Sequence, residues 1–246
     1  MDFTKLDMLR AKLGALRPLN RTELNRLRRE FMIENTYNSN AIEGNTLTLR
    51  ETALILQEGL TIAEKPVKEH LEAIGHKDAF EYVLKLSAAN TVLTEREIRE
   101  IHSLVLIDDA ENKGIYRSVP VRISGAPQTP PAPYLVPARM ERLLSDYELW
   151  KRERHIIEAV AEFHLCFEMI HPFIDGNGRT GRLVLNLELI KAGLLPVDIK
   201  FTDRRKYYDC FDRYGETGFP ADLAGLLARY ETEELEKYIV ILERHK

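Results

Sequence analysis

Hydrophobic residues recur at helical spacing along most of the chain. The clearest stripe repeats at offsets of 0, 4, 7, 11 and 14 residues and consists of Ile156, Val160, Phe163, Phe167 and Ile170. A second stripe, ending near Gly193 and Pro196, consists of Leu183, Leu187, Ile190 and Leu194. Such spacing places the apolar side chains on one face of a helix. The two stripes therefore predict two buried helices with a short connection between them.

The sequence also marks where other helices begin. Thr48 and Thr94 each precede an apolar run, and each is followed three residues later by a glutamate, which is the pattern of a capping box. We expect one helix from about Leu49 to Gly59 and another after Thr94. Residues 66–89 continue in helical period, so helices dominate this half of the chain.

One segment, residues 114–137, has a different pattern. Its hydrophobic residues Val119, Val121 and Ile123 alternate with Pro120, Arg122 and Ser124 ahead of a proline-rich stretch. Alternation of this kind is typical of a strand and predicts a short β-hairpin near residues 115–125. Helical patterning resumes at Ala138 and extends, with interruptions at 171–182 and near 215–221, to the C-terminus. The expected fold class is therefore mainly α.

The overall composition excludes several classes of protein. The chain has 246 residues, of which 44% are hydrophobic and 30% charged, as in a globular domain with a full-sized core. Its 39 acidic and 35 basic residues give a formal charge of −4, so no overall positive field attracts nucleic acid or an anionic membrane. No apolar signal region begins the chain, and no apolar run approaches the ~18 residues of a membrane span. We expect a cytoplasmic protein with neither nucleic acid nor a membrane as partner.

The connection between the two buried helices reads HPFIDGNGRTGR, residues 171–182. It contains G-x-G-x-x-G, but a dinucleotide-binding fingerprint must follow a buried strand, and here a helical stripe precedes the glycines. A P-loop is excluded as well, because Arg182 and Leu183 stand where lysine and then serine or threonine are required. The segment is therefore a glycine-rich loop between two helices.

A loop of this kind suits a polyanion such as the phosphate chain of a nucleotide. The N-terminus of the second helix presents free backbone N–H groups and the positive end of the helix dipole. Gly176, Asn177 and Gly178 let an anion approach closely. Arg179 and Arg182, three residues apart, offer planar donors for phosphate oxygens. The sequence thus predicts a phosphate-binding loop.

Two residues beside these glycines have matching chemistry. Pro172 disfavours helical geometry at His171, so the first helix ends there and leaves at the loop mouth an imidazole that can accept a proton from a hydroxyl. Asp175 is a hard oxygen ligand, which together with nucleotide phosphates holds Mg²⁺. His164 and Glu168 share a helix face with His171, but the two histidines are about 10.5 Å apart along the helix, too far for one zinc ion. We interpret His164 as a core histidine and Glu168 as a hydrogen-bond partner that orients His171; the alternative for His171 is a simple helix cap.

These twelve residues resemble the signature of the Fic family, H-x-F-x-[DE]-G-N-G-R-x-x-R, at every specified position. Members of that family are mostly helical and transfer AMP from ATP to a serine, threonine or tyrosine hydroxyl of a target protein. The resemblance implies a protein adenylyltransferase that uses ATP with Mg²⁺, with His171 as general base and Asp175 as metal ligand. The nucleotide-binding residues that it implies here are Asp175, Gly176, Asn177, Gly178, Arg179, Thr180, Gly181 and Arg182, the two arginines gripping the β- and γ-phosphates.

A second motif lies well upstream. SNAIEG, residues 39–44, resembles the inhibitory [ST]-x-x-x-E-[GN] motif that some Fic proteins carry. Ser39 and Glu43 are four residues apart and so share a helix face, and Gly44 is suited to end that helix. The resemblance implies that Glu43 pairs with Arg182 and keeps the γ-phosphate of ATP from seating productively. A solvated glutamate is the alternative.

Further implied contacts lie on the other sides of the nucleotide. Residues 117–124 resemble the flap of the family, a hairpin that lines the nucleotide pocket and aligns the target by strand addition. Its edge consists of Val121, Arg122, Ile123 and Ser124, and a purely structural hairpin is the alternative. Tyr207 and Tyr208 resemble tyrosines near the nucleotide. Residues 214–216 depart from the family, because several relatives place an asparagine there and this chain has Tyr-Gly-Glu.

The resemblance also sets the expected organisation. Residues 1–34 form an N-terminal helical extension and residues 35–215 a Fic-type helical bundle, with the inhibitory helix at about 35–44, the flap at about 114–137 and the catalytic loop at 171–182. Residues 216–246 form a C-terminal helical segment, in the same domain or as a small appendage. Because the family often dimerises, a homodimer is expected. Two other functions stay open: removal of AMP, with Glu43 positioning a water molecule, and a nucleotide-binding regulatory module without turnover.

Overall fold

The computed structural model describes residues 1–16, 21–123 and 129–244, which form helices and loops without a strand. The helices are α1 (Thr4–Ala15), α2 (Arg21–Ile42), α3 (Leu49–Ala53), α4 (Val67–Ala88), α5 (Glu95–Val105), α6 (Val136–Glu153), α7 (Ile156–Ile170), α8 (Asn177–Lys191), α9 (Arg204–Thr217) and α10 (Ala221–Arg244). A π-helical turn, Leu54–Glu58, continues α3, and 3-10 turns occupy Pro133–Leu135 and Phe201–Asp203. The mainly α fold class is confirmed. None of the described helices combines the length and the apolar character needed to cross a membrane.

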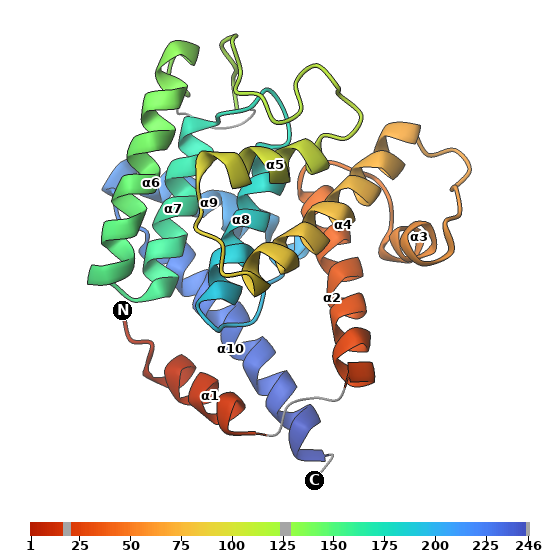
Figure 1. Cartoon of the computed structure of the whole chain (residues 1–246), viewed down its shortest axis with the longest axis vertical. Helices are drawn as coiled ribbons and strands as arrows, with labels where there is room; N and C mark the ends of the chain where they lie inside the picture. The colour runs from red at the N-terminus through yellow and green to blue at the C-terminus, as the bar shows by residue number, and fades with distance from the viewer. Residues whose placement is uncertain (17–20, 124–128, 245–246) are drawn as a thin grey trace.

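The two helices predicted from the apolar stripes lie at the centre of the fold (Figure 1). α7 packs against α8, α6 and α10, and α8 packs in addition against α4 and α5. Phe163 and Phe167 on α7, like Leu183 and Leu187 on α8, are at most 1% exposed. Each such buried side chain contributes roughly 1.5–3 kcal/mol relative to an exposed one. The loop between α7 and α8 is therefore held at both ends by helices that are packed in the core.

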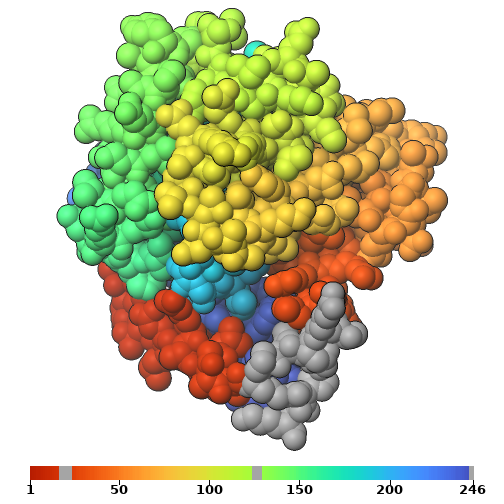
Figure 2. Space-filling model, in the orientation of Figure 1, coloured from red at the N-terminus to blue at the C-terminus, as the bar shows by residue number. Residues whose placement is uncertain are grey.

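The first and last helices lie side by side at one end of the molecule (Figure 1). α1 packs along α10, and Phe3 and Leu6 belong to the same hydrophobic core as Leu235. At another side, α3 and the beginning of α4 form a lobe that is visible in the space-filling view (Figure 2). The domain boundary expected after residue 34 falls inside α2, and the one expected after residue 215 falls inside α9.

Both predicted capping boxes are confirmed. Thr48 N donates to Glu51 Oε2 at 2.7 Å, and Glu51 N donates to Thr48 Oγ1 at 3.2 Å. The helical segment that follows ends at Gly59, whose φ of 66° lies in the left-handed region. At the start of α5, Thr94 N donates to the Glu97 carboxylate at 3.0 Å. These helix ends were predictable because each depends on residues close together in sequence.

The prediction of a β-hairpin near residues 115–125 is wrong in its described part. Residues 115–123 and 129–132 contain no strand, and Ser124 lies outside the described residues. Pro120 has no N–H group to give to a strand ladder. The backbone N–H of Arg117 donates to Pro172 O at 2.9 Å, which ties this segment to the loop between α7 and α8 instead of to a neighbouring strand.

Candidate active site

The loop between α7 and α8 begins with a change of backbone direction at His171. α7 ends at Ile170, and His171 adopts left-handed geometry with φ 50° and ψ 62°, its N–H donating to Phe167 O at 2.9 Å. Pro172 prevents the helix from continuing, as the sequence predicts. Gly176, with φ 73°, is the N-cap residue just before α8, a position where a left-handed conformation costs glycine least.

Internal hydrogen bonds and ring stacking hold the loop in one shape. Asn177 Nδ2 donates to Phe173 O and Asn177 Oδ1 accepts from Phe173 N, both at 2.9 Å. Phe173 is fully buried and its ring stacks on His102 at a centroid distance of 3.6 Å. Both ends of the Asn177 side chain are therefore used inside the loop, so only the backbone N–H of this residue remains for a phosphate.

His102 on α5 fixes the far end of the loop, and sequence reasoning did not find it. Its Nδ1 accepts a hydrogen bond from Gly114 N at 2.8 Å, so Nε2 carries the proton and donates to Asp175 O at 2.9 Å. Burial lowers the pKa of His102 to about 4. The imidazole is thus a neutral structural element whose role depends on contacts between distant segments, and no local pattern marks it.

His171 is set up as a proton acceptor. Its imidazole lies close to α7, with Nδ1–H donating to Glu168 O at 3.3 Å, so the lone pair of Nε2 is left to accept a proton. Burial lowers the pKa of His171 below its usual value. The imidazole is therefore neutral near physiological pH, which is the form that a general base requires.

Arg182 on α8 is bonded to α2. The guanidinium donates from Nε to Ser39 Oγ at 3.0 Å, and from Nη2 to Ser39 O at 2.8 Å and to Glu43 Oε1 at 2.8 Å. The Arg182 side chain is 4% exposed and that of Glu43 35%. Although burial opposes the charge, the Glu43 carboxylate raises the pKa of Arg182 above its usual value. The structure thus joins the two sequence motifs through one ion pair.

The Glu43 carboxylate also lies directly against the glycine-rich loop. A Cβ atom added to Gly178 would be 2.1 Å from Glu43 Oε1, much closer than two such atoms can approach. Only glycine at this position lets the carboxylate reach the first turn of α8. That turn presents free N–H groups and the positive end of the helix dipole. Glu43 therefore takes the position in which this helix N-terminus would bind an anion.

Asp175 is the more accessible charged group of the loop. Its carboxylate accepts from Gly176 N at 2.6 Å, and Lys68 Nζ lies 3.6 Å from Oδ2. Partial burial opposes ionisation, but Arg179, the Gly176 amide and Lys68 outweigh it and lower the pKa of Asp175. The described residues contain no group of three or more histidine, cysteine or acidic side chains that could hold a metal. A metal bound here would need oxygens from a ligand beside Asp175.

Arg179 is buried, and its Nη2 donates to Asp175 Oδ1 of the loop at 3.5 Å. Its side chain is 2% exposed, and Nη1 lies 3.4 Å from Glu72 Oε1 on α4. Glu72 also accepts from Asn45 Nδ2 at 2.8 Å, so it connects Arg179 to the turn that follows Glu43. Arg182 is the arginine of this pair that meets the Glu43 carboxylate, one residue after the end of α2, whereas Arg179 is packed between α8 and α4.

The remaining predicted residues lie under or beside this centre. Tyr207 on α9 is buried and its hydroxyl lies 2.6 Å from His164 Nε2, so it supports α7 from within the core. Tyr208 is partly exposed and its hydroxyl donates to Ile42 O at 3.4 Å. Thr180 and Gly181 are buried on α8, which places them beneath the loop, with Glu168 beside them. Burial raises the pKa of Glu168 to about 8, and Glu43 acts in the same direction.

Val121, Arg122 and Ile123 belong to no helix or strand. The structure therefore gives these three residues no edge for strand addition. Their segment contacts the loop through Arg117, which sequence reasoning passed over, and through Tyr116, whose ring lies 5.4 Å from that of Phe173.

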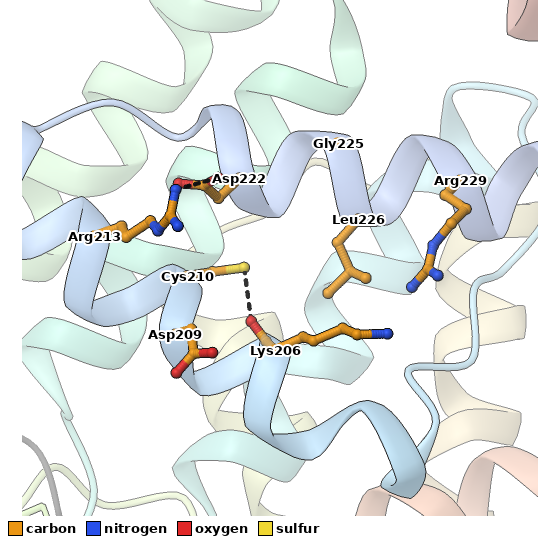
Figure 3. Close-up of a pocket in the computed structure, with 8 residues that line it drawn as sticks. All are labelled: Lys206, Asp209, Cys210, Arg213, Asp222, Gly225, Leu226 and Arg229. Carbon is orange, nitrogen blue, oxygen red and sulfur yellow. Dashed lines mark hydrogen bonds and ion pairs between the residues drawn. The ribbon is translucent and has the colours of Figure 1, made fainter.

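A separate open pocket of about 370 Å³ lies between α9 and α10 (Figure 3). Three cationic side chains line it, but each has an acidic partner: Lys206 and Arg229 pair with Asp203 at 2.7 and 3.1 Å, and Arg213 pairs with Asp222 at 3.4 Å. Its cations are already neutralised, so the pocket offers no second anion site.

Comparisons with known proteins converge on one family. Residues 92–189 match the model of the Fic/DOC family. A curated relative from Nematostella vectensis, named Protein adenylyltransferase Fic, is 38% identical over 212 residues, which make up 83% of this chain and 48% of the relative. The chain spans about half the length of the curated relatives it matches.

Two solved structures resemble the fold over nearly the whole chain. One is a Fic domain containing signaling protein from Bacteroides thetaiotaomicron, with a TM-score of 0.88 and 28% identity, covering 98% of this chain and 97% of that one. The other is Fic-1 from C. elegans, with a TM-score of 0.84 and 28% identity, covering 99% of this chain and 72% of that one.

Proposed function

Because this chain belongs to the Fic/DOC family, we propose that it is a protein adenylyltransferase, which transfers AMP from ATP to a serine, threonine or tyrosine hydroxyl of a target protein. Curated relatives with that name are 34–38% identical over most of the chain. One structural observation supports the proposal most directly. The neutral imidazole of His171 lies beside the N-terminus of α8, where the Glu43 carboxylate occupies the position of an anion. The cytoplasmic location and the homodimer stay predictions.

His171 is the base in this reaction. With Nδ1–H donating to Glu168 O, Nε2 accepts the proton of the target hydroxyl. The hydroxyl oxygen then forms a bond to the α-phosphorus while the bond from that phosphorus to the bridging oxygen breaks. Pyrophosphate leaves with the electron pair of the broken bond. The burial that keeps His171 neutral also keeps it available for this proton.

The phosphates of ATP belong at the N-terminus of α8, where Gly176 and Gly178 allow close approach of the backbone N–H groups. Arg182 is the cation for the terminal phosphate after Glu43 has left it. Asp175 fits a magnesium ligand, because its carboxylate is half exposed and lies beside the same N–H groups. Mg²⁺ bound with ATP would neutralise charge on the phosphates.

Glu43 is the inhibitory residue in this proposal. Its carboxylate pairs with Arg182 at 2.8 Å and lies against Gly178, so it competes with a phosphate for the same cation and the same helix N-terminus. Ser39 reinforces the pairing through two bonds to the guanidinium. Relief of this inhibition requires that Glu43 move away from Arg182 or be removed.

Removal of AMP is a second candidate, and one observation favours it. Only Oε1 of Glu43 accepts a hydrogen bond from the described residues, and the side chain is a third exposed. Oε2 is then available to orient a water molecule toward a bound AMP–protein bond. In this reading Glu43→Gly abolishes activity, whereas it increases AMP transfer in the first.

The test follows the label from ATP. Wild type, Glu43→Gly and Glu43→Gly/His171→Ala are incubated with Mg²⁺ and either α-³²P-ATP or γ-³²P-ATP, alone and with cell lysate. We expect label from α-³²P-ATP only, strongest in Glu43→Gly and absent in the double variant. Label from γ-³²P-ATP would make the protein a kinase. No label in any variant would leave AMP removal or a nucleotide-binding module without turnover.

A further inference from the structure

Arg117 is a buried cation to which no acidic side chain is bonded in the described part of the chain. It lies between α5 and α6, is 4% exposed, and pairs with no carboxylate among the described residues. Burial lowers its pKa below the usual arginine value. Buried arginines are usually paired with acids. Without such a pair, other hydrogen-bond acceptors must satisfy the N–H groups of the guanidinium.

Backbone carbonyls replace the missing acid. Nε donates to His171 O at 2.8 Å, Nη1 to Val119 O at 3.2 Å, and Nη2 to Pro131 O at 2.6 Å and Ile170 O at 3.3 Å. Four carbonyl groups from three places in the chain thus meet one guanidinium. Its five N–H groups in a fixed plane suit such a cluster.

Two of these carbonyls end α7. The last carbonyls of a helix lack partners within the helix and carry the negative end of its dipole, so a cation stabilises them. Arg117 binds the carbonyls of Ile170 and His171, and its backbone N–H donates to Pro172 O at 2.9 Å. Three successive carbonyl groups across the turn are therefore fixed by one residue.

His171 needs this support because its backbone is in a conformation that favours glycine. Its φ of 50° and ψ of 62° are left-handed, a region that a non-glycine residue adopts only when its surroundings hold it there. The direction of the His171 carbonyl is set by ψ, and Arg117 Nε holds that carbonyl. The same backbone geometry determines where the imidazole points.

We infer that Arg117 is a positioning residue: it holds the turn at His171 in its left-handed geometry, and it joins that turn to both sides of the segment that contains Val119 and Pro131. This inference rests on the proposed function, in which His171 is the base. Arg117 does not touch the reacting atoms in this role. It acts through the backbone of the residue that does.

Lysine cannot take over this role. A lysine at position 117 keeps the positive charge but carries one nitrogen, which does not reach carbonyls spread around a planar group. Arg117→Lys therefore separates geometry from charge. Arg117→Gln removes both.

The matched control is Arg99→Gln. Arg99 on α5 also donates to a backbone carbonyl of the same connecting segment, Gly114 O at 2.6 Å, but it makes no hydrogen bond to the turn at His171. Arg99→Gln therefore also removes a hydrogen bond between an arginine and a backbone carbonyl, but it leaves the support of His171 intact.

The experiment places Arg117→Lys, Arg117→Gln and Arg99→Gln in the Glu43→Gly protein. For both Arg117 variants we expect kcat of AMP transfer to fall about 100-fold, the loss typical of a base misplaced by about 1 Å. The dissociation constant for ATP, measured by calorimetry, should change less than about threefold, because the phosphate site lies on α8. Arg99→Gln should keep kcat within about threefold of its parent.

A second readout does not depend on turnover. In protein labelled with ¹³C and ¹⁵N at histidine, the backbone chemical shifts of His171, assigned with His171→Ala, should move away from left-handed values in both Arg117 variants and stay in place in Arg99→Gln. Unchanged His171 shifts, or parallel losses of kcat, ATP binding and melting temperature in an Arg117 variant, would overturn the inference. If neither the Glu43→Gly parent nor any of its variants transfers AMP, the proposed function is refuted. The backbone chemical shifts of His171 still test whether Arg117 holds the turn.

Discussion

The contact between Glu43 and the glycine-rich loop makes Gly178→Ala an informative substitution. A Cβ at this position would lie 2.1 Å from Glu43 Oε1 and 3.0 Å from Arg182 Nη1. Arg182 is buried, whereas the Glu43 side chain is about a third exposed and its carboxylate has room to turn toward solvent. The overlap is therefore relieved by movement of the Glu43 carboxylate away from Arg182.

Two effects of opposite sign determine the change in stability. Replacing a helical glycine by alanine raises the free energy of unfolding by about 0.5–1 kcal/mol. Separating Glu43 from the guanidinium removes a hydrogen bond between charged groups, which costs about 1.5–3 kcal/mol. We therefore expect Gly178→Ala to lower the free energy of unfolding of the wild type by about 1–2 kcal/mol. In the Glu43→Gly background only the gain of about 0.5–1 kcal/mol should remain.

Urea unfolding of the four proteins, followed by circular dichroism, measures this coupling. The double-mutant cycle should give an interaction energy of about 1.5–3 kcal/mol between positions 43 and 178. If Gly178→Ala has the same effect in both backgrounds, with a coupling below about 0.5 kcal/mol, the carboxylate does not lie where the structure places it.

Three further predictions concern residues outside the loop. Asp198 is buried and accepts from Asn38 on α2 at 2.7 Å. If Glu43 inhibits as proposed, Asp198→Ala should loosen α2, which carries Ser39 and leads into Glu43, and raise the basal rate of AMP transfer about fivefold, the factor produced by ~1 kcal/mol. An unchanged rate would contradict this. Burial raises the pKa of Glu231 from 4.5 to about 8, so the folded state holds a proton that the unfolded state has released, and stability should fall as pH rises from 4.5 to 8. Glu231 should make the free energy of unfolding fall by on the order of 1 kcal/mol per pH unit in this range, and Glu231→Gln should remove this contribution. Thermal unfolding with the same pH dependence in both proteins would contradict the prediction. A Cβ on Gly75 would lie 2.5 Å from Leu104 O on α5, so Gly75→Ala should lower the free energy of unfolding by about 1–3 kcal/mol in urea titrations, and a more stable variant would refute the close approach of α4 and α5.

The parts of the site that sequence could predict are those set by neighbouring residues. Pro172 stops α7 at His171, and Gly44, two residues after the end of α2, turns the chain away with φ 101°. The capping threonines act within three residues of themselves. The ion pair between Glu43 and Arg182 joins distant segments, and only the resemblance to a family with both motifs indicated it.

The parts that sequence could not predict depend on packing between distant segments. The alternation around Val119 indicated a strand, but a strand needs a neighbouring strand to bond with. Here the Val119 carbonyl accepts a hydrogen bond from the Arg117 side chain instead. Tyr207 is buried against His164, and its ring lies under the Arg182 guanidinium at 5.8 Å; its expected place near a nucleotide stays a prediction. His102 stacks on the loop from α5, and nothing within its own helix distinguishes it from any buried histidine.

The central claim is that His171 is the base for AMP transfer and that Glu43 inhibits this transfer. Its most direct test is the initial rate of protein labelling from α-³²P-ATP in wild type, Glu43→Gly and Glu43→Gly/His171→Ala. We predict that Glu43→Gly labels at least about tenfold faster than wild type, since ~1.4 kcal/mol of lost competition gives that factor, and that loss of His171 abolishes the gain. Equal rates in wild type and Glu43→Gly, or full labelling without His171, would contradict the claim.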